Sequence, residues 1–528
     1  MEFWLTDDTS QLMRGSAKGS LVLMMGQVIA SIISAITVIW LARALGSTDY
    51  GQYTVALIPA SIALLFQDLG MNMSITRFCA MYRHEGQRNR LKSVVLTGLI
   101  FSIFTSLIIS GFMYVFAGPI ASIYLKRPEV EPMVRAASLS VLGAGGLVTT
   151  IQAIFIGYEI MSLSSLLQIS WTVIRTVFSV ILIFSGSGAF GAVLAYTSSQ
   201  VVAGLIGLIL LFMYVKFEPS SKEIFSLKML KIFLSYGLPL SVGNLLNGVL
   251  TQIFNSIMVL YMTTDLIGNY GAASNFGVLV SFLTVPIATT LFPLYSKFKE
   301  GDPQLNIIFQ VAVKYTSMVT LPIVMSIIAL STPLSRVLYG SEDYPYVPLY
   351  LSLFILVYAW EGFGGLSLGN LISGVGESKV TLRAQIIRFI TGIILALILV
   401  PKYGMVGLLG AKVLEGRSGW IYQILWVKRK LGISVDWGST ARIYLTALAA
   451  FVSTFLLINI LSLSGLNALV LGGLTYLLVY IAGLPLSGAF KQSDLNQFES
   501  IIDVLGPIAP STRWLLNLMR RLIRTRDP

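Results

Sequence analysis

The sequence predicts an all-α polytopic membrane protein with about fourteen transmembrane helices, in two tandem six-helix lobes followed by two extra helices. The chain is 55% hydrophobic and 11% charged, with a mean hydropathy of +0.81. A soluble protein of 528 residues would need far more polar surface. The longest apolar stretches exceed the roughly 20 residues that cross a bilayer as a helix, and they lack the alternation of barrel strands. The two halves of the chain also repeat.

Glycines, prolines and clusters of charged residues separate the expected spans. The apolar stretches fall near residues 20–42, 51–75, 94–117, 132–156, 162–185, 188–214, 232–262, 268–293, 310–333, 346–372, 380–401, 404–427, 441–464 and 466–487. The first twelve stretches belong to the repeat, and the last two follow it.

The distribution of basic residues predicts the orientation. The first dozen residues are acidic and polar, so no cleavable signal peptide is expected and the N-terminus is placed in the cytoplasm. With an even number of spans, both termini are expected on the cytoplasmic side. The expected membrane is the plasma membrane. Most loop lysines and arginines become cytoplasmic, as the positive-inside rule requires. The outside loops hold only Arg43, Lys126, Arg127, Arg135, Arg336 and Lys402.

Several kinds of chemistry are disfavoured by composition. A single cysteine, Cys79, excludes an intramolecular disulfide, and a single histidine, His84, argues against a histidine-rich metal site. No cofactor and no enzymatic activity are expected. The net charge is +12, but the basic residues that produce it lie between the hydrophobic spans. Their placement therefore indicates the topology and does not indicate a nucleic-acid partner.

The internal repeat relates the halves by a constant offset. Gly51 matches Gly268 and Gly157 matches Gly374, each 217 residues later. Six spans per half give both halves the same orientation, which predicts a pseudo-twofold axis along the membrane normal and a substrate path between the lobes. The expected organisation is an N-terminal lobe at 1–215, a C-terminal lobe at 216–430, two additional helices at 431–488 and a basic tail at 489–528.

Ionisable residues inside the spans are candidates for function, because such groups are costly in lipid unless they are paired or face water. They are Asp68, Arg175, Lys314, Glu361, Arg388, Lys412, Glu415 and Arg417. Bases outnumber acids in this set. A cationic cavity suits an anionic head group such as a phosphate or diphosphate.

Structural roles for the same residues stay open. Glu361 and Arg388 fall at similar depths on neighbouring spans and could form a pair that holds helices together. Lys412 and Glu415 are three residues apart and could pair on one helix face. Lys314 lies near a span end, where a lysine is expected to snorkel to the surface.

Two arginines and two polar stripes remain as cavity candidates. Arg175 and Arg417 have no acidic partner evident in the sequence. Gln27 in the first span and Asn244, Asn247 and Asn255 in the seventh lie on stripes at helical spacing, and amide groups can both donate to and accept from sugar hydroxyls. Such stripes either join helices or line a wet cavity.

The C-terminal segment STRWLLNLMRRLIRTRDP predicts a basic amphipathic helix. Leu515, Leu518, Met519 and Leu522 share one face, and arginines occupy other positions. We expect this helix to lie on the anionic cytoplasmic leaflet, with a docking contact for another protein as the alternative.

Four segments resemble the polysaccharide transporters, the O-antigen flippase-like branch of the multidrug/oligosaccharidyl-lipid/polysaccharide exporter superfamily. They are LARALGSTDYGQYTVAL after the first span, FQDLGMNMSITRF closing the second, LSYGLPLSVGNLLN opening the seventh and LIGNYGAASNF before the eighth. The resemblance covers residues 14–430. It implies a V-shaped pair of lobes that moves a lipid-linked oligosaccharide across the membrane by alternating access. It also implies a structural role for the loop motif at Arg43, Gly46, Tyr50 and Gly51.

These expectations combine into one hypothesis for the site. Arg175, Arg388 and Arg417, with Lys412 nearby, are expected to bind the phosphate of an anionic lipid-linked oligosaccharide, and the stripes of spans 1 and 7 are expected to bind the glycan. Asp68, Glu361 and Glu415 are the candidates for coupling to a Na⁺ or H⁺ gradient or for structural pairs. Membrane lipids and glycan-assembly enzymes are the expected partners, and the sequence does not determine an oligomeric state.

Other functions remain as alternatives. The chain also resembles drug/cation antiporters of the same superfamily, although its buried acids are few. Lipid II-type flippases share the fourteen-span count. A membrane glycosyltransferase or polymerase would need a long, acid-rich outside loop, and the best such loop, Ser341-Glu342-Asp343, is typical of a turn. A purely structural scaffold would not explain ionisable residues at mid-membrane.

Overall fold

The computed structural model describes residues 7–215, 225–299, 302–340, 342–501 and 509–526. Within these ranges the regular structure is helical, with no strand. The chain forms two compact units, Met1–Ala272 and Ala273–Pro528. The predicted fold class, an all-α polytopic membrane protein, is confirmed.

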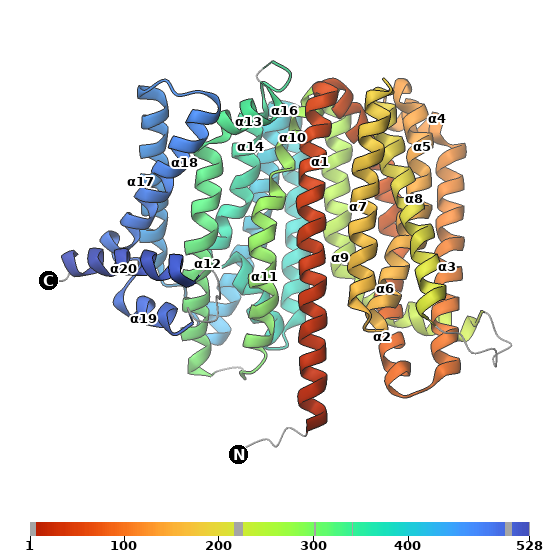
Figure 1. Cartoon of the computed structure of the whole chain (residues 1–528), viewed down its shortest axis with the longest axis horizontal. Helices are drawn as coiled ribbons and strands as arrows, with labels where there is room; N and C mark the ends of the chain where they lie inside the picture. The colour runs from red at the N-terminus through yellow and green to blue at the C-terminus, as the bar shows by residue number, and fades with distance from the viewer. Residues whose placement is uncertain (1–6, 216–224, 300–301, 341, 502–508, 527–528) are drawn as a thin grey trace. The chain divides into compact units, whose positions relative to one another are not determined.

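The first unit contains the elements of the expected first half and the start of the second. They are α1 (Asp7–Asp68), α2 (Met71–His84), α3 (Arg88–Val115), α4 (Ala117–Pro119), η1 (Ile120–Tyr124), η2 (Pro128–Val130), α5 (Glu131–Ser140), η3 (Val141–Thr149), α6 (Thr150–Gly157), α7 (Met161–Phe184), α8 (Gly188–Tyr214), α9 (Leu227–Tyr261) and α10 (Thr264–Ser274), which ends just beyond the unit. Helix α7 packs between α1 and α8 (Figure 1). Helix α1 bends at Gly46, whose φ of 73° suits glycine, and so holds the first expected span and most of the second.

The helices of the first unit approach closely through small residues. The π-helical segment η3 carries Gly143, Gly145 and Gly146, and a β-carbon on Gly146 would lie 3.0 Å from the β-carbon of Ser106 in α3. Lipid tails are as apolar as the side chains, so helices in a bilayer associate through this kind of close packing. Phe233 of α9 is fully buried in the core of this unit with Ile154 of α6.

The second unit contains the remaining elements. They are α11 (Gly277–Tyr295), α12 (Pro303–Ala329), α13 (Ser331–Tyr339), α14 (Val347–Ile355), η4 (Leu356–Phe363), α15 (Gly365–Gly374), α16 (Ser378–Leu431), α17 (Trp437–Ile460), α18 (Gly465–Ser487), α19 (Gln492–Ile501) and α20 (Ala509–Arg526). Helix α16 runs through Gly404, which has a φ of 57°, so it also joins two expected spans.

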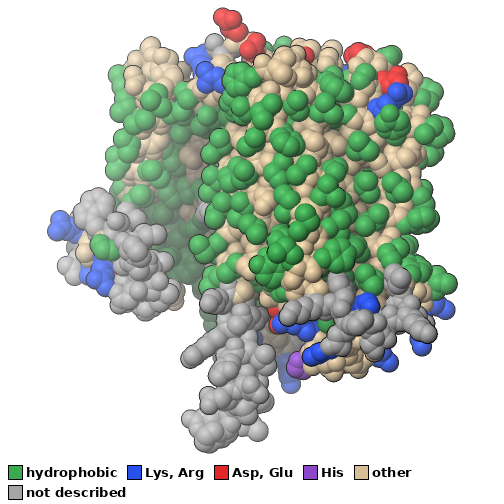
Figure 2. All heavy atoms as spheres, turned by 45° about the vertical axis from the view of Figure 1, so that its right-hand side comes forward, with side chains coloured by type: hydrophobic (Ala, Val, Ile, Leu, Met, Phe, Trp, Pro, Cys, Tyr) green, Lys and Arg blue, Asp and Glu red, His purple; other side chains and the backbone are tan. Residues whose placement is uncertain are grey.

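The outer surface of the helices is apolar, as lipid contact requires. Phe104, Leu107 and Phe112 of α3 are each more than half exposed. Apolar side chains cover the face shown in Figure 2, and lysines and arginines gather at its lower edge. In the described part of the chain, ten helices are long and apolar enough to cross a membrane, or eleven with the bent α9. Because α1 and α16 each hold two expected spans, the count of fourteen stays a prediction.

The repeat is visible as equivalent contacts in the two halves. A β-carbon on Gly157 would lie 2.5 Å from the β-carbon of Cys79, and one on Gly374 would lie 3.2 Å from the backbone nitrogen of Ser296. Each pair is related to the other by the same 217 residues. These tight contacts join the ends of α6 and α15 to their neighbours, so the duplicated sequence folds with duplicated local packing.

The lobe boundary expected at 215/216 differs from the division into compact units. Helix α9, which opens the second half of the repeat, packs against α1 and α2 in the first unit. The four-part organisation of the chain therefore stays a prediction.

The last two spans are joined to the second unit. Helix α17 packs on α12, and the hydroxyl of Tyr480 in α18 donates to the carbonyl oxygen of Met318 at 2.9 Å. Lys314 of α12, expected to snorkel, instead forms an ion pair with Asp494 of α19 at 2.6 Å, where both side chains are largely buried. Helix α19 is thereby tied to the membrane-spanning part of the unit, and Tyr315 adds a hydrogen bond to Asp494 at 3.1 Å.

Helix α20 crosses the direction of α17 and α18, as a helix lying along a membrane surface would (Figure 1). One side of it is buried against the protein through Leu516, Met519 and Ile523. Leu518 remains exposed, and Arg520 pairs with Glu499 of α19. Part of its apolar surface thus contacts the protein, where the sequence predicted a face directed at lipid.

Candidate functional site

The second expected span is interrupted in the first unit. Helix α1 ends at Asp68 and α2 begins at Met71, and the two residues between them, Leu69 and Gly70, have φ values of 44° and 77°. The Asp68 carboxylate accepts a hydrogen bond from the backbone N–H of Asn72 at 3.0 Å. Discontinuous membrane helices expose backbone groups and often mark the substrate or ion sites of transporters.

A bent helix meets this interruption. The two parts of α9, Leu227–Pro239 and Ser241–Tyr261, differ in direction by 50°. A β-carbon on Gly237 would lie 2.8 Å from the carbonyl carbon of Gly70, and the Ser74 hydroxyl donates to the carbonyl oxygen of Phe233 at 2.8 Å. Two irregular spans therefore contact each other next to Asp68.

Arg175 of α7 is buried among tyrosines. It is 8% exposed, donates to the hydroxyl of Tyr53 at 2.9 Å and lies 5.2 Å from the ring centre of Tyr196. Among the described residues no carboxylate forms an ion pair with it, and its Nε has no hydrogen-bond partner. The interior of this half therefore holds a positive charge compensated by hydroxyl and ring contacts.

The polar stripes lie on α1 and α9 as expected. Gln27 is exposed on α1, while Asn247 and Asn255 are half-buried on α9. The Asn255 amide donates to Oε1 of Gln252 at 3.2 Å, which adds Gln252 to the stripe. The side chain of Asn244 lies outside the described residues, so its predicted role remains untested.

The tenth expected span is also interrupted, in the second unit. Helix α14 passes into the 3₁₀ segment η4 and then, after Gly364 with a φ of 85°, into α15. Arg417 of α16 stacks on this segment with its guanidinium 4.0 Å from the ring centre of Trp360, and it donates to the carbonyl oxygen of Leu356 at 3.4 Å. The arginine thus lies at an irregular part of the membrane region.

An aromatic cluster that includes Trp360 lies beside Arg417. The rings of Trp360 and Trp420 have centres 5.6 Å apart, and Phe363 stacks on Tyr444 at 4.3 Å. The indole N–H of Trp420 donates to the carbonyl oxygen of Phe363 at 3.2 Å. The sequence reasoning did not identify these aromatic residues, because it searched the spans for charge. The three-residue spacing of Trp360 and Phe363 was the available signal.

Arg388 forms an ion pair with Glu415 in the same helix. Its Nε and Nη2 donate to the two carboxylate oxygens of Glu415, each at 3.1 Å. This bidentate pair joins the two halves of α16, and a hydrogen bond between Thr391 and Ser418 at 2.7 Å lies beside it. The side chain of Glu361 lies outside the described residues, so its predicted pairing with Arg388 remains untested.

The pairing of Glu415 also bears on Lys412 and on ion coupling. Glu415, the candidate partner of Lys412, accepts hydrogen bonds from Arg388 with both of its carboxylate oxygens. Lys412 is half-buried on the same helix. No group of three or more His, Cys, Asp or Glu residues that could hold a metal ion occurs within the described ranges.

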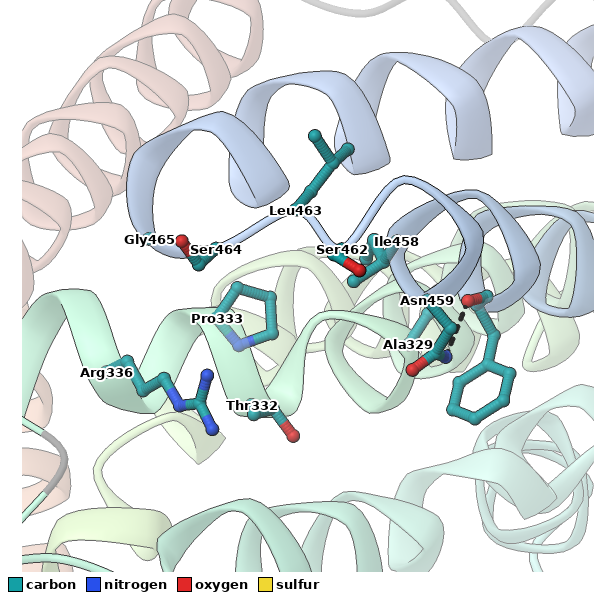
Figure 3. Close-up of a pocket in the computed structure, with 11 residues that line it drawn as sticks. Ala329, Thr332, Pro333, Arg336, Ile458, Asn459, Ser462, Leu463, Ser464 and Gly465 are labelled. Atoms are coloured by element: carbon teal, nitrogen blue, oxygen red, sulfur yellow. Dashed lines mark hydrogen bonds between the residues drawn. The ribbon is translucent and has the colours of Figure 1, made fainter.

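A surface pocket of about 350 Å³ lies elsewhere in the second unit (Figure 3). Its walls come from the end of α12, from α13, from the end of α17 and from the turn that follows it, and they include Arg336 and Asn459. None of the residues predicted for the site lines this pocket.

Comparison with known proteins agrees with the resemblance found in the sequence. The family described as polysaccharide biosynthesis protein matches residues 16–299. A protein of Shigella flexneri named as an O-antigen transporter is 22% identical over 399 residues, covering 74% of this chain and 92% of the relative. An uncharacterized membrane protein of Methanocaldococcus jannaschii is 20% identical over 428 residues, covering 77% of this chain and 83% of the relative.

Solved structures share the fold. The lipid II flippase MurJ in an inward closed conformation matches with a TM-score of 0.71 and 16% identity, covering 88% of this chain and 98% of MurJ. A multidrug resistance MATE family transporter of the MOP superfamily matches with TM-scores of 0.64 in an inward-facing and 0.56 in an outward-facing conformation, both at 19% identity. These matches cover 77% and 79% of this chain, and 94% and 95% of the transporter. The fold is that of membrane transporters. Because the family match spans more than half of the sequence, the chain belongs to the polysaccharide biosynthesis protein family.

Proposed function

We propose that the protein flips a lipid-linked oligosaccharide across the plasma membrane by alternating access, with both termini in the cytoplasm. The family assignment and the transporter fold support this class of function. A glycan and its phosphate cannot cross hydrocarbon unaided, because their polar groups would lose their water partners. The protein's task is to replace those partners while the lipid tail stays in the bilayer.

The observation that carries the proposal is the arginine and aromatic cluster at the interrupted tenth span. Arg417 offers a charged donor fork for a phosphate oxygen. Trp360 and Trp420 are half-buried and offer flat apolar faces of the kind that the C–H faces of sugar rings contact, while their N–H groups bind polar atoms. A sugar phosphate carries a charged phosphate and an apolar ring face within one monosaccharide unit.

Some of the other candidate residues are also assigned to binding of the lipid-linked oligosaccharide, and one is not. The stripes of α1 and α9, with Gln27 and Asn247, are assigned to the glycan. Arg175 is assigned to the anion in a state in which its tyrosine contacts open. Arg388 leaves the set, because Glu415 already neutralises it through two hydrogen bonds.

Alternating access is supported by the irregular spans and by the fold. Breaks at Leu69–Gly70 and at η4 provide places where helix segments can change direction. A transporter of similar fold is known in an inward-facing and an outward-facing conformation. Coupling to Na⁺ or H⁺ is assigned to Asp68, whose carboxylate lies at the break of the second span.

The proposal is tested with purified protein in vesicles that contain a fluorescent lipid-linked oligosaccharide. Arg417→Ala is expected to reduce the flipping rate by about ten-fold or more, since a charge-assisted hydrogen bond contributes about 1.5–3 kcal/mol. Trp360→Ala is expected to act in the same direction, and Trp360→Phe to retain most activity. Arg135→Ala is the control, because Arg135 is exposed and pairs with Glu131 at the start of α5. Flipping by Arg417→Ala at the parent rate would refute the assignment.

Two alternative functions differ from the proposed one in the substrate that is transported. A cation-coupled multidrug antiporter is favoured by Asp68 at a helix break, and a lipid II-type flippase by the structural match to MurJ. Expression in pump-deficient cells would confer resistance to cationic dyes if the antiporter function is correct. Vesicles that contain lipid II in place of the lipid-linked oligosaccharide test the second alternative. If the protein flips oligosaccharides, glycan-assembly enzymes are its expected partners.

A further inference from the structure

Two helices of the first unit cross through their first turns. The part of α1 that follows the bend at Gly46 begins at Ser47, and α10 begins at Thr264. A β-carbon on Gly51 would lie 2.7 Å from the carbonyl carbon of Thr264, and one on Gly268 would lie 2.8 Å from the carbonyl carbon of Ser47. Both distances are well inside van der Waals contact, so neither position has room for a side chain.

These two contacts are equivalent under the repeat. Ser47 and Thr264 are 217 residues apart, and so are Gly51 and Gly268. Gly51 contacts the carbonyl group of Thr264, which lies four residues before Gly268. Gly268 contacts the carbonyl group of Ser47, which lies four residues before Gly51. A local two-fold axis therefore relates the two segments, since an arbitrary helix contact would not pair equivalent positions in both directions.

Neighbouring contacts hold the crossing in register. A β-carbon on Gly271 would lie 3.2 Å from Oγ1 of Thr54, one turn further along both helices. Tyr50 and Tyr53 are buried beside Gly51, and Tyr53 is held by Arg175.

The loop before α5 braces the start of α10. Arg127 donates from Nε to Oγ1 of Thr264 at 3.2 Å, from Nη1 to the carbonyl oxygen of Val259 at 2.9 Å and from Nη2 to that of Met262 at 2.5 Å. These carbonyls end α9, so the guanidinium caps that helix. Partial burial lowers the pKa of Arg127, but the group remains charged at neutral pH because guanidinium is such a strong base.

We propose that the Gly51–Gly268 crossing is the outer seal of the transport path, which must open before cargo leaves on the outside. The proposal rests on the proposed function and on its orientation, which places Ser47 and Thr264 at the outer side. Glycines let the two backbones touch, so the closed seal leaves no gap for water. Gly51 and Gly268 are thus positioning residues of the transport cycle.

A reversible cross-link tests whether the seal must open. Thr54→Cys and Gly271→Cys, combined in a Cys79→Ser background, place two thiols within reach of a disulfide. Oxidation is expected to stop flipping in vesicles, and a reductant is expected to restore it. The control pair is Thr37→Cys with Thr176→Cys, whose hydroxyls are 2.6 Å apart and join α1 to α7 within one half. The control should cross-link without stopping transport. Full transport by the oxidised Thr54–Gly271 variant would overturn the proposal.

A second measurement needs no substrate. Ser34 lies seven residues after Gln27, on the same face of α1. In the same Cys79→Ser background, Ser34→Cys reports access from outside to a membrane-impermeant maleimide. Gly51→Ala and Gly268→Ala are each expected to raise its labelling rate several-fold by holding the seal open. Gly111→Ala is the control, because nothing lies within 4 Å of a β-carbon there. Labelling at the parent rate in both alanine variants would overturn the seal. A protein that moves some other cargo would still show the labelling change, so failure of the proposed function is a separate result.

Discussion

At the scale of single residues, the charged groups within the spans differ in how they are compensated. Arg388 binds Glu415 through two hydrogen bonds, Arg417 stacks on Trp360, and Arg175 lies among tyrosines. A buried charge must find one of these partners, since hydrocarbon offers none. Residue type alone predicted that these arginines matter. Which groups each arginine contacts depends on neighbours from distant parts of the sequence.

The Arg388–Glu415 pair gives a prediction at this scale. Glu415→Gln should lower the stability of the purified protein by about 1–3 kcal/mol, because it leaves a partly buried guanidinium without its counter-charge; the value is reduced for solvent access to Arg388. Combining Arg388→Met with Glu415→Leu should recover much of the loss, as removing both partners avoids the isolated charge. Thermal unfolding in detergent measures both. Equal stability of parent and Glu415→Gln would show that the pair contributes nothing.

At the scale of elements, interruptions carry more functional meaning than regular helices. The breaks at Leu69–Gly70 and in η4 lie beside Asp68 and Arg417, and the bend at Gly46 precedes the Gly51–Gly268 crossing. Glycine permits a positive φ without a steric penalty, whereas Leu69 adopts one at some cost. Glycine positions were readable in the sequence, but only the fold shows which of them produce breaks.

The start of α17 yields a prediction with a pH dependence. Asp436 caps this helix by accepting from the backbone N–H of Ser439 at 3.1 Å, and hydrogen bonding to Ser439 holds the pKa of its carboxyl below the usual value. Asp436→Ala should cost about 1 kcal/mol at pH 7. A carboxyl with a lowered pKa in the folded state stabilises above its unfolded pKa near 4, and this contribution disappears as the pH falls through the folded pKa. Melting curves of both proteins should therefore converge below about pH 4.

At the scale of the whole molecule, the internal repeat and the helices added after it, α17 to α20, contribute different contacts to the fold. The repeat produces equivalent contacts at Gly157 and Gly374, while α17 to α20 attach to the second unit through Lys314, Asp494 and Tyr480. The added helices are therefore packed parts of the fold. Their contacts to α12 give them a defined place beside the duplicated core.

The Lys314–Asp494 pair should control how firmly the C-terminal helices are attached. Asp494→Asn removes the charge that holds Lys314 and weakens the hydrogen bond from Tyr315, so α19 and α20 should separate more often from the rest of the unit. Limited proteolysis after residue 488 should accelerate several-fold in this variant. Gln492→Ala is the matched control, since Gln492 is exposed and bonds only to Asn496 among the described contacts. Equal cleavage rates in the two variants would contradict the role assigned to the pair.

The sequence by itself determined the membrane class, the helical fold, the repeat and the family, because hydrophobicity, its period and the constant offset are local or translational properties of the chain. It also identified the arginines as unusual. Only the tertiary structure decided that Arg388 binds Glu415, that Arg417 stacks on Trp360, and that Gly51 meets Thr264 while Gly268 meets Ser47. Partner choice depends on the directions and depths at which separate helices cross, and the periodicity of one helix contains no information about the other.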